Sequence, residues 1–177
     1  MLTTMLRIRS IPHSHGDRLA QLYRIVAREP DALIREAFEI SDAYIDRILR
    51  TAIQRGLMLG AYQNGTLVGE IHAYTPTEQA FRHLLADLTI LVHPEHRGQG
   101  IGRRLFSVFL KTVEQQFSHI HRVELFVREH NRKNVEFYTR LGFNNEGRQA
   151  EKILNVSGEL ETPLHMVWYN PAYIKSA

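Results

Sequence analysis

The chain has 177 residues, of which 44% are hydrophobic and 23% charged, which is typical of a folded globular protein rather than a disordered chain. Its 22 basic and 19 acidic residues leave a net charge of +3, too small an excess to indicate nucleic-acid binding. It has no cysteine, which excludes disulfides, thiolate catalysis and cysteine-type zinc sites.

The length and the apolar runs bound the architecture further. A chain of this size fits one domain, so we expect a single domain over residues 1–177. No apolar run approaches the ~18 residues of a membrane span, and we find no signal-peptide pattern at the N-terminus. We therefore expect a cytoplasmic protein without a membrane partner.

The first third of the chain predicts one strand and two helices. Residues 6–11 alternate apolar and polar side chains, as a half-buried strand does. Asp17 is placed to cap a first helix, and a second helix is expected from Ser41 to Gly56. The pattern of residues 28–40, between the helices, is ambiguous.

Three strands are predicted next. Asn64-Gly65 separates two apolar runs, residues 57–62 and 67–74, and favours the tight turn of a β-hairpin. Residues 84–92 form a further apolar run, which Pro94 ends because proline lacks the backbone donor that a strand needs.

The second half of the chain predicts two helices and three strands. Apolar residues recur at spacings of three and four in the central helix; these are Ile101, Leu105, Val108, Phe109, Thr112, Val113 and Phe117. Residues 121–128 read as a strand, and Asn131 is placed to cap a short helix. Residues 143–169 predict two strands joined by a polar loop at 155–161.

The most informative stretch is the loop before the central helix, Arg97-Gly98-Gln99-Gly100-Ile101-Gly102. Three glycines at alternate positions let the backbone turn sharply and approach a ligand closely. A helix that begins there presents unpaired N–H groups and the positive end of its dipole. The spacing matches neither a G-x-G-x-x-G dinucleotide fingerprint nor a P-loop. The loop therefore predicts a binding site for an anion, such as a phosphate.

This loop, with Val92-His93-Pro94 before it, resembles the R-x-x-G-x-G signature of the GNAT family of N-acetyltransferases. The resemblance implies that acetyl-coenzyme A is the cosubstrate and that the loop amides hold its pyrophosphate. The implied cofactor-binding residues are Leu91, Val92, Arg97, Gly98, Gln99, Gly100, Ile101, Gly102 and Arg103. It also implies an α/β (α+β) fold, a mixed, mostly antiparallel sheet of six to seven strands with helices on both faces.

A second pattern resembles another signature of the family, N-x6-Y-x3-G-F, and comprises Asn131, Tyr138, Gly142 and Phe143. The resemblance implies that Asn131 contacts the cofactor and that Tyr138 lies near the thioester sulfur. Tyr138 would then be a general acid that protonates the departing coenzyme A thiolate. The alternative is that Tyr138 is only a buried aromatic side chain that packs on its neighbours.

The acceptor amine must lose a proton before it can attack, since a lysine-like amine has a pKa near ~10.4. Asp87 is the first candidate for the base, because period two places it on one strand face with Thr89. Glu70, which shares a face of its strand with His72, is the second. Each could instead be a structural strand residue, and the reaction could need no dedicated base.

These features predict an enzyme that moves an acetyl group from acetyl-coenzyme A to a primary amine by direct attack in a ternary complex. The acceptor could be a small molecule, an amino-acid analogue or a protein N-terminus, and a homodimer is compatible with the resemblance. The alternative is a non-catalytic acetyl-coenzyme A sensor of the same fold. A nucleic-acid module using Arg103, Arg104 and Lys111 is disfavoured by the mild charge. The ten histidines lack standard zinc spacings, so no metal is expected.

Overall fold

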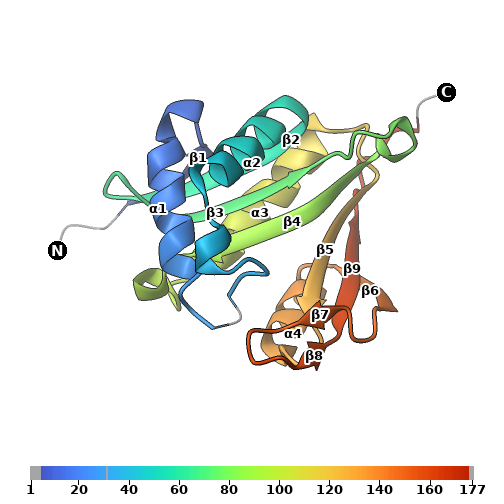
Figure 1. Ribbon diagram of the computed structural model, residues 1–177. Coiled ribbons are helices and arrows are strands. Elements are labelled where there is room, and N and C mark those ends of the chain that lie inside the picture. The colour runs from blue at the N-terminus through green and yellow to red at the C-terminus, as the bar shows by residue number, and fades with distance from the viewer. Residues whose placement is uncertain (1–4, 31, 176–177) are drawn as a thin grey trace. The chain divides into compact units, whose positions relative to one another are not determined.

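The computed structural model describes residues 5–30 and 32–175, and Figure 1 shows their helices and strands. The helices are α1 (Gly16–Val26), α2 (Asp42–Arg55), α3 (Ile101–Gln116) and α4 (Arg132–Arg140). The strands are β1 (Leu6–Ser10), β2 (Gly56–Gln63), β3 (Thr66–Tyr74), β4 (Leu84–Val92), β5 (Arg122–Arg128), β6 (Asn144–Arg148), β7 (Ile153–Leu154), β8 (Leu160–Glu161) and β9 (Pro163–Tyr169).

Seven of these strands form a mixed sheet in the order β1-β2-β3-β4-β5-β9-β6. Strand β4 pairs parallel with β5 at Leu84 and Leu85, whereas β1–β2, β2–β3, β5–β9 and β9–β6 are antiparallel. The predicted fold class, a mixed and mostly antiparallel sheet with helices, is therefore confirmed.

The described residues divide into two compact units, each built from two segments of the chain. The first unit contains the residues up to Tyr74 together with Thr89–Thr112, and the second contains Thr75–Leu88 together with the residues from Val113 onward. Strand β4 and helix α3 each contribute residues to both units.

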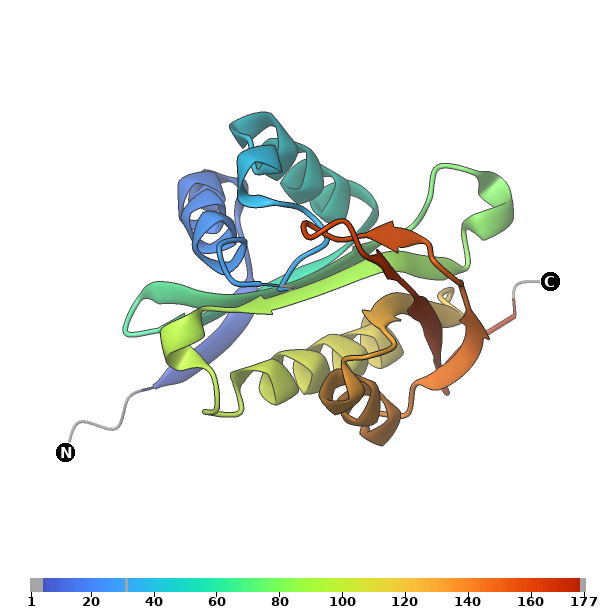
Figure 2. The ribbon, with the colours of Figure 1, turned by 60° about the horizontal axis from the view of Figure 1, so that its bottom comes forward.

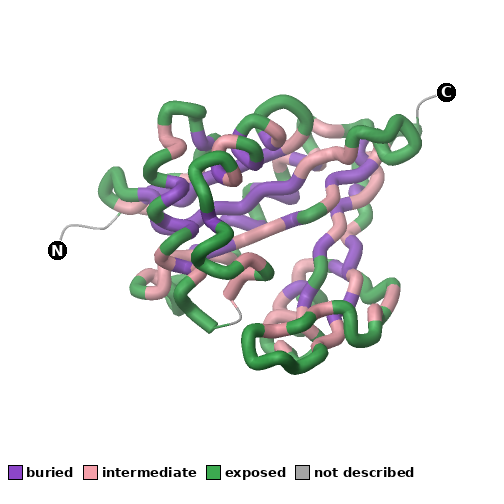
Figure 3. Tube along the Cα trace, viewed as in Figure 1, coloured by how far each residue is buried: buried purple, intermediate pink, exposed green. Residues whose placement is uncertain are grey.

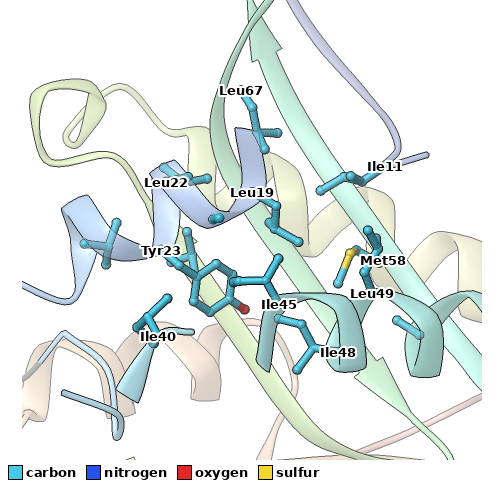
Figure 4. Close-up of a cluster of buried hydrophobic side chains, with 14 of the residues drawn as sticks. Ile11, Leu19, Leu22, Tyr23, Ile40, Ile45, Ile48, Leu49, Met58 and Leu67 are labelled. Atoms are coloured by element: carbon cyan, nitrogen blue, oxygen red, sulfur yellow. The ribbon is translucent and has the colours of Figure 1, made fainter. Parts of the chain in front are cut away.

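In the first unit, helices α1 and α2 lie on one face of β1–β3 and α3 lies on the other (Figure 2). Leu19, Leu22 and Tyr23 of α1 pack with Ile45 and Ile48 of α2 in a buried cluster (Figure 4). On the opposite face Gly69 leaves room for α3, because a Cβ there would lie 3.1 Å from Leu105 and 3.3 Å from Ile101. Figure 3 shows the buried stretches along β2 and β3 that result.

The second unit is organised around β5 and β9. Alternate residues of β5, Val123, Leu125 and Val127, are buried as the sequence predicts, and so are Leu164 and Met166 of β9. Helix α4 follows β5 and ends at Gly142, whose φ of +94° suits a glycine.

The predicted hairpin and one predicted helix cap are confirmed. Asn64 and Gly65 have φ angles of +51° and +82°, as a tight turn between β2 and β3 requires. The Ser41 hydroxyl accepts a hydrogen bond from the Tyr44 N–H at 3.1 Å and so caps α2.

The prediction that Asp17 caps the first helix is wrong. A 3-10 turn at His13–His15 runs directly into α1, so the helix begins at Gly16 with His15 as its N-cap. The backbone at Asp17 is already helical, and its carboxylate lies in the first turn, where the helix dipole favours a negative charge.

Gly56 ends α2 as predicted, but it does not take the left-handed conformation in which a glycine often ends a helix. Its φ of −161° is extended, and it is the first residue of β2. A Cβ on Gly56 would lie 2.2 Å from the Ala73 carbonyl oxygen, so the close approach of β3 requires the glycine.

Two further details differ from the sequence prediction. In α3 the expected residues Ile101, Leu105, Phe109 and Val113 are buried, but Phe106 and Leu110 complete the buried face and Val108 is 38% exposed. The expected polar loop at 155–161 is present at residues 155–159, where it joins two short strands that the sequence did not predict, β7 and β8, which pair in a sheet of their own. Of the ambiguous segment 28–40, the described part contains one 3-10 turn, Ala37–Glu39.

Candidate functional site

The loop between β4 and α3 has the backbone that its glycines predict. After the 3-10 turn Pro94–His96 the chain passes through Gly98 at φ +76° and Gly100 at φ +75°. This left-handed conformation disfavours side chains, although a Cβ on either glycine would meet no atom within 4 Å. Both glycines are therefore required by the backbone conformation, while the space beside them stays open.

Polar contacts fix the β4 end of this loop within the first unit. The His93 N–H donates to the Val68 carbonyl at 2.8 Å, and Arg97 Nε donates to the Val92 carbonyl at 3.2 Å. Arg97 also forms an ion pair with Glu29 at 3.5 Å. The Arg97 side chain thus holds the loop against the end of β4, a role that the sequence did not predict.

Helix α3 begins at the end of the loop. Ile101 is buried and anchors the first turn, whereas Arg103 is exposed. Gly102 lies in the first turn, and a Cβ there would be 3.9 Å from Ile90 and Val92. A helix start that follows an exposed glycine loop presents N–H groups to solvent, an arrangement that binds anions.

The structure places the other predicted cofactor residues beside this helix start. Leu91 is buried and Val92 half-buried at the end of β4, while Gln99 is exposed at the tip of the loop. The predicted cofactor-binding set from Leu91 to Arg103 therefore forms one continuous segment of the first unit.

The predicted second signature lies in the second unit. The Asn131 side chain accepts a hydrogen bond from the Asn134 N–H at 3.2 Å, which caps α4 as predicted. Tyr138 is buried, and its ring lies 5.5 Å from that of Phe137 and 6.1 Å from that of Phe143. Burial raises the pKa of Tyr138 to about 12, so the phenol keeps its proton at neutral pH.

Asp87, the first candidate for the base, is exposed and has an unusual backbone. Its φ of +53° lies in the left-handed region, which is uncommon for a residue other than glycine inside a strand. It follows the short parallel pairing of β4 with β5 at Leu84 and Leu85. This conformation was not predicted from the sequence.

Glu70, the second candidate, is fully buried. Its Oε1 lies 2.9 Å from His72 Nδ1, and its Oε2 accepts a hydrogen bond from the Tyr23 hydroxyl at 3.1 Å. Burial and the nearby Glu70 carboxylate raise the pKa of Tyr23 well above its ordinary value, so this phenol is a donor. The alternation of β3 placed Glu70 and His72 on one face, but the contribution of Tyr23 from α1 required the tertiary structure.

The remaining expectations concern a metal site and a membrane-spanning helix. Among residues 5–30 and 32–175, no group of three or more histidine, aspartate or glutamate side chains is arranged to hold a metal ion. No helix in that part of the chain is long and apolar enough to cross a membrane.

Residues 19–143 match the sequence model of the acetyltransferase (GNAT) family. The chain is 26% identical over 138 residues to the spermidine N(1)-acetyltransferase of Vibrio cholerae serotype O1, which covers 77% of this chain and 75% of that protein.

Solved structures share the fold. The Salmonella typhimurium protein yncA, determined with its cofactor acetyl-CoA, superposes with a TM-score of 0.85 at 15% identity and covers 98% of this chain and 99% of its own. A phosphinothricin acetyltransferase from Sinorhizobium meliloti in complex with acetyl-CoA gives a TM-score of 0.83 at 18% identity, over 97% of this chain and 92% of its own.

Proposed function

Because the chain belongs to the acetyltransferase (GNAT) family, we propose that it transfers the acetyl group of acetyl-CoA to a primary amine by direct attack in a ternary complex. The observation that carries this proposal is the open glycine loop at residues 97–102, with Gly98 and Gly100 in the left-handed conformation before the start of α3. Backbone N–H groups in such a loop suit the pyrophosphate of the cosubstrate.

Two side chains of the second unit have proposed roles in the same reaction. Tyr138 donates its hydroxyl proton or a hydrogen bond to the sulfur of the departing coenzyme A, which suits a phenol that burial keeps protonated. Asn131 contacts the cofactor arm, and its role as the cap of α4 fixes the amide in place.

The choice of acceptor amines to test begins from the relative that is named for its acceptor. A spermidine acetyltransferase with 26% identity supports a polyamine as the first acceptor to test. Amino-acid analogues and peptides with a free N-terminus form the other two classes of the panel.

The experiment combines calorimetric titration of acetyl-CoA with a thiol-release assay over these three classes of amine. We expect binding of acetyl-CoA, and release of one thiol for each acetylated amine, with a reaction lacking amine as the control for hydrolysis. Binding without thiol release for any acceptor would identify a sensor instead of an enzyme, and absence of binding would contradict both functions.

A further inference from the structure

The first unit contains a polar cluster in an otherwise apolar region, namely Tyr23, Glu70 and His72. The side chain of Glu70 has no exposed surface and that of His72 has 3%, and Tyr23 is also buried. Around them lie apolar side chains of α1, α2 and β2, including Leu19, Ile45 and Met58.

This cluster is not explained by stability. Removing a carboxylate and an imidazole from water costs several kcal/mol or more, and buried charged groups can often be replaced by apolar side chains without loss of stability. The pair therefore needs another explanation, and its geometry supplies one.

The hydrogen bonds fix which nitrogen of His72 carries the proton. A carboxylate accepts hydrogen bonds and donates none. Oε2 of Glu70 accepts a hydrogen bond from the Tyr23 hydroxyl, and Oε1 lies 2.9 Å from His72 Nδ1. Nδ1 is therefore the protonated nitrogen, and the lone pair is on Nε2, at the opposite side of the ring.

Aromatic rings border the cluster. The His72 ring stacks on Tyr74 at 6.0 Å with an interplanar angle of 13°, and the Tyr23 ring meets Tyr44 of α2 edge to face. The guanidinium groups of Arg35 and Arg47 lie over Tyr44, at 4.5 Å and 5.5 Å from its centroid. Glu70 is thus the carboxylate in direct contact with His72.

We propose that His72 is the proton acceptor of the acetyl transfer and that Glu70 is the positioning residue that orients it. This inference rests on the proposed function and replaces Asp87 and Glu70 as direct bases. Imidazole has a reference pKa near ~6.5, so it accepts protons near neutral pH better than a carboxylate does. Because His72 is almost fully buried, the proton reaches Nε2 through water rather than from the amine directly.

The acceptor nitrogen loses two protons during the transfer. The ammonium form of the acceptor loses one proton to Nε2, and the neutral amine attacks the thioester carbon, so that a C–N bond forms. The C–S bond then breaks, the coenzyme A sulfur leaves as a thiolate, and it takes the second proton of the attacking nitrogen. The proton on His72 returns to solvent, and the products are an amide and a thiol.

His72→Asn tests the proposal at one atom. The amide nitrogen of asparagine occupies the position of Nδ1 and can still donate to Glu70, whereas nothing replaces Nε2. We expect turnover at pH 7 to fall by ~100-fold to ~10,000-fold, with an unchanged dissociation constant for acetyl-CoA. The deficit should shrink toward pH ~11, where an amine of pKa near ~10.4 is largely neutral.

The matched control is His119→Asn, the same change at an exposed histidine of the second unit, which should follow the parent at every pH. Glu70→Gln is the second variant, and it should lower turnover at pH 7 by less than His72→Asn does, with the same recovery toward high pH. It also provides the test if His72→Asn does not fold. Solvent isotope effects on both variants would show whether proton transfer has become slower.

The outcomes separate the two proposals. If the parent releases thiol and His72→Asn keeps the parent's turnover at pH 7, the cluster is structural and only this inference is overturned. If His72→Asn loses turnover equally at all pH values, His72 is not the proton acceptor. If the parent binds acetyl-CoA but acetylates no amine, the proposed function fails, and this inference fails with it.

Discussion

At the scale of single residues, the environment of Tyr138 limits how it can act. Its pKa of about 12 exceeds the ~8.5 of a reference thiol by roughly 3.5 units, or ~5 kcal/mol. Complete proton transfer from this phenol to a thiolate is therefore uphill while the tyrosine stays buried. A hydrogen bond from the hydroxyl to the developing negative charge on sulfur has no such cost.

We predict that Tyr138→Phe lowers the single-turnover rate by ~100-fold, the lower end of the range for a positioned acid, and leaves the acetyl-CoA dissociation constant unchanged. The loss should be the same from pH 6 to 9, because a phenol with a pKa of about 12 stays protonated throughout. Titration calorimetry and rapid-quench kinetics measure both quantities. Weaker binding with normal turnover would instead make Tyr138 a packing residue.

Asp87 offers a test of backbone conformation. Its φ of +53° is tolerated by asparagine but strained for a β-branched residue, which costs ~1–2 kcal/mol there. We predict that Asp87→Asn unfolds in urea within ~0.5 kcal/mol of the parent and that Asp87→Val is less stable by that cost. Equal stability of the two variants would show that the left-handed backbone is not maintained.

The same asparagine variant tests the sequence prediction for the base. A loss of rate confined to moderate pH in Asp87→Asn would assign the proton acceptor to Asp87 and count against His72.

These residues also show what sequence can predict of a site. The glycine loop and Tyr138 were predicted as site residues because the patterns that point to them are local spacings along the chain. The contact of Tyr23 with Glu70 joins residues 47 positions apart, and no spacing rule connects them. The φ angle of Asp87 likewise depends on its strand neighbours rather than on its own preference.

At the scale of elements, the glycines at the start of α3 are needed for two different reasons. Gly98 and Gly100 have positive φ angles, so a side chain there strains the loop itself. Gly102 lies in the first turn of α3 and has no atom closer than 3.9 Å to an added Cβ. A change at Gly102 therefore reports on a ligand more than on the fold.

We predict that Gly102→Ala melts at or above the temperature of the parent, since alanine is the better helix former by up to ~1 kcal/mol. Its affinity for acetyl-CoA should nevertheless fall by ~10-fold or more, a loss of at least ~1.4 kcal/mol. Gly98→Ala is the matched variant and should lower the melting temperature as well. Tight binding of acetyl-CoA by Gly102→Ala would remove the pyrophosphate from this position.

Element boundaries were predictable where one local interaction decides them. Ser41 caps α2 through its own hydroxyl, so the sequence identified it. Asp17 has the same preference for a cap, but the turn before it had already started the helix. The pairing of β7 with β8 depends on two dipeptides that carry too little pattern to be recognised.

At the scale of the whole molecule, the two units raise the question of cooperativity. Each unit is made of two chain segments, and β4 and α3 supply residues to both. Unfolding of β4 or α3 in one unit would therefore also alter the other unit. The expectation of a single domain stays a prediction, which unfolding experiments can test.

We predict one cooperative thermal transition. Trp168, the single tryptophan, lies on β9 of the second unit, whereas α1 and α2 of the first unit contribute much of the helical circular dichroism. In a two-state chain the two probes give coincident melting curves. Acetyl-CoA at ~100 times its dissociation constant adds ~2.7 kcal/mol and should raise both curves together by roughly 5–10 °C. A tryptophan curve that separates from the helical curve, or that ignores acetyl-CoA while the helical curve shifts, would show that the units unfold independently.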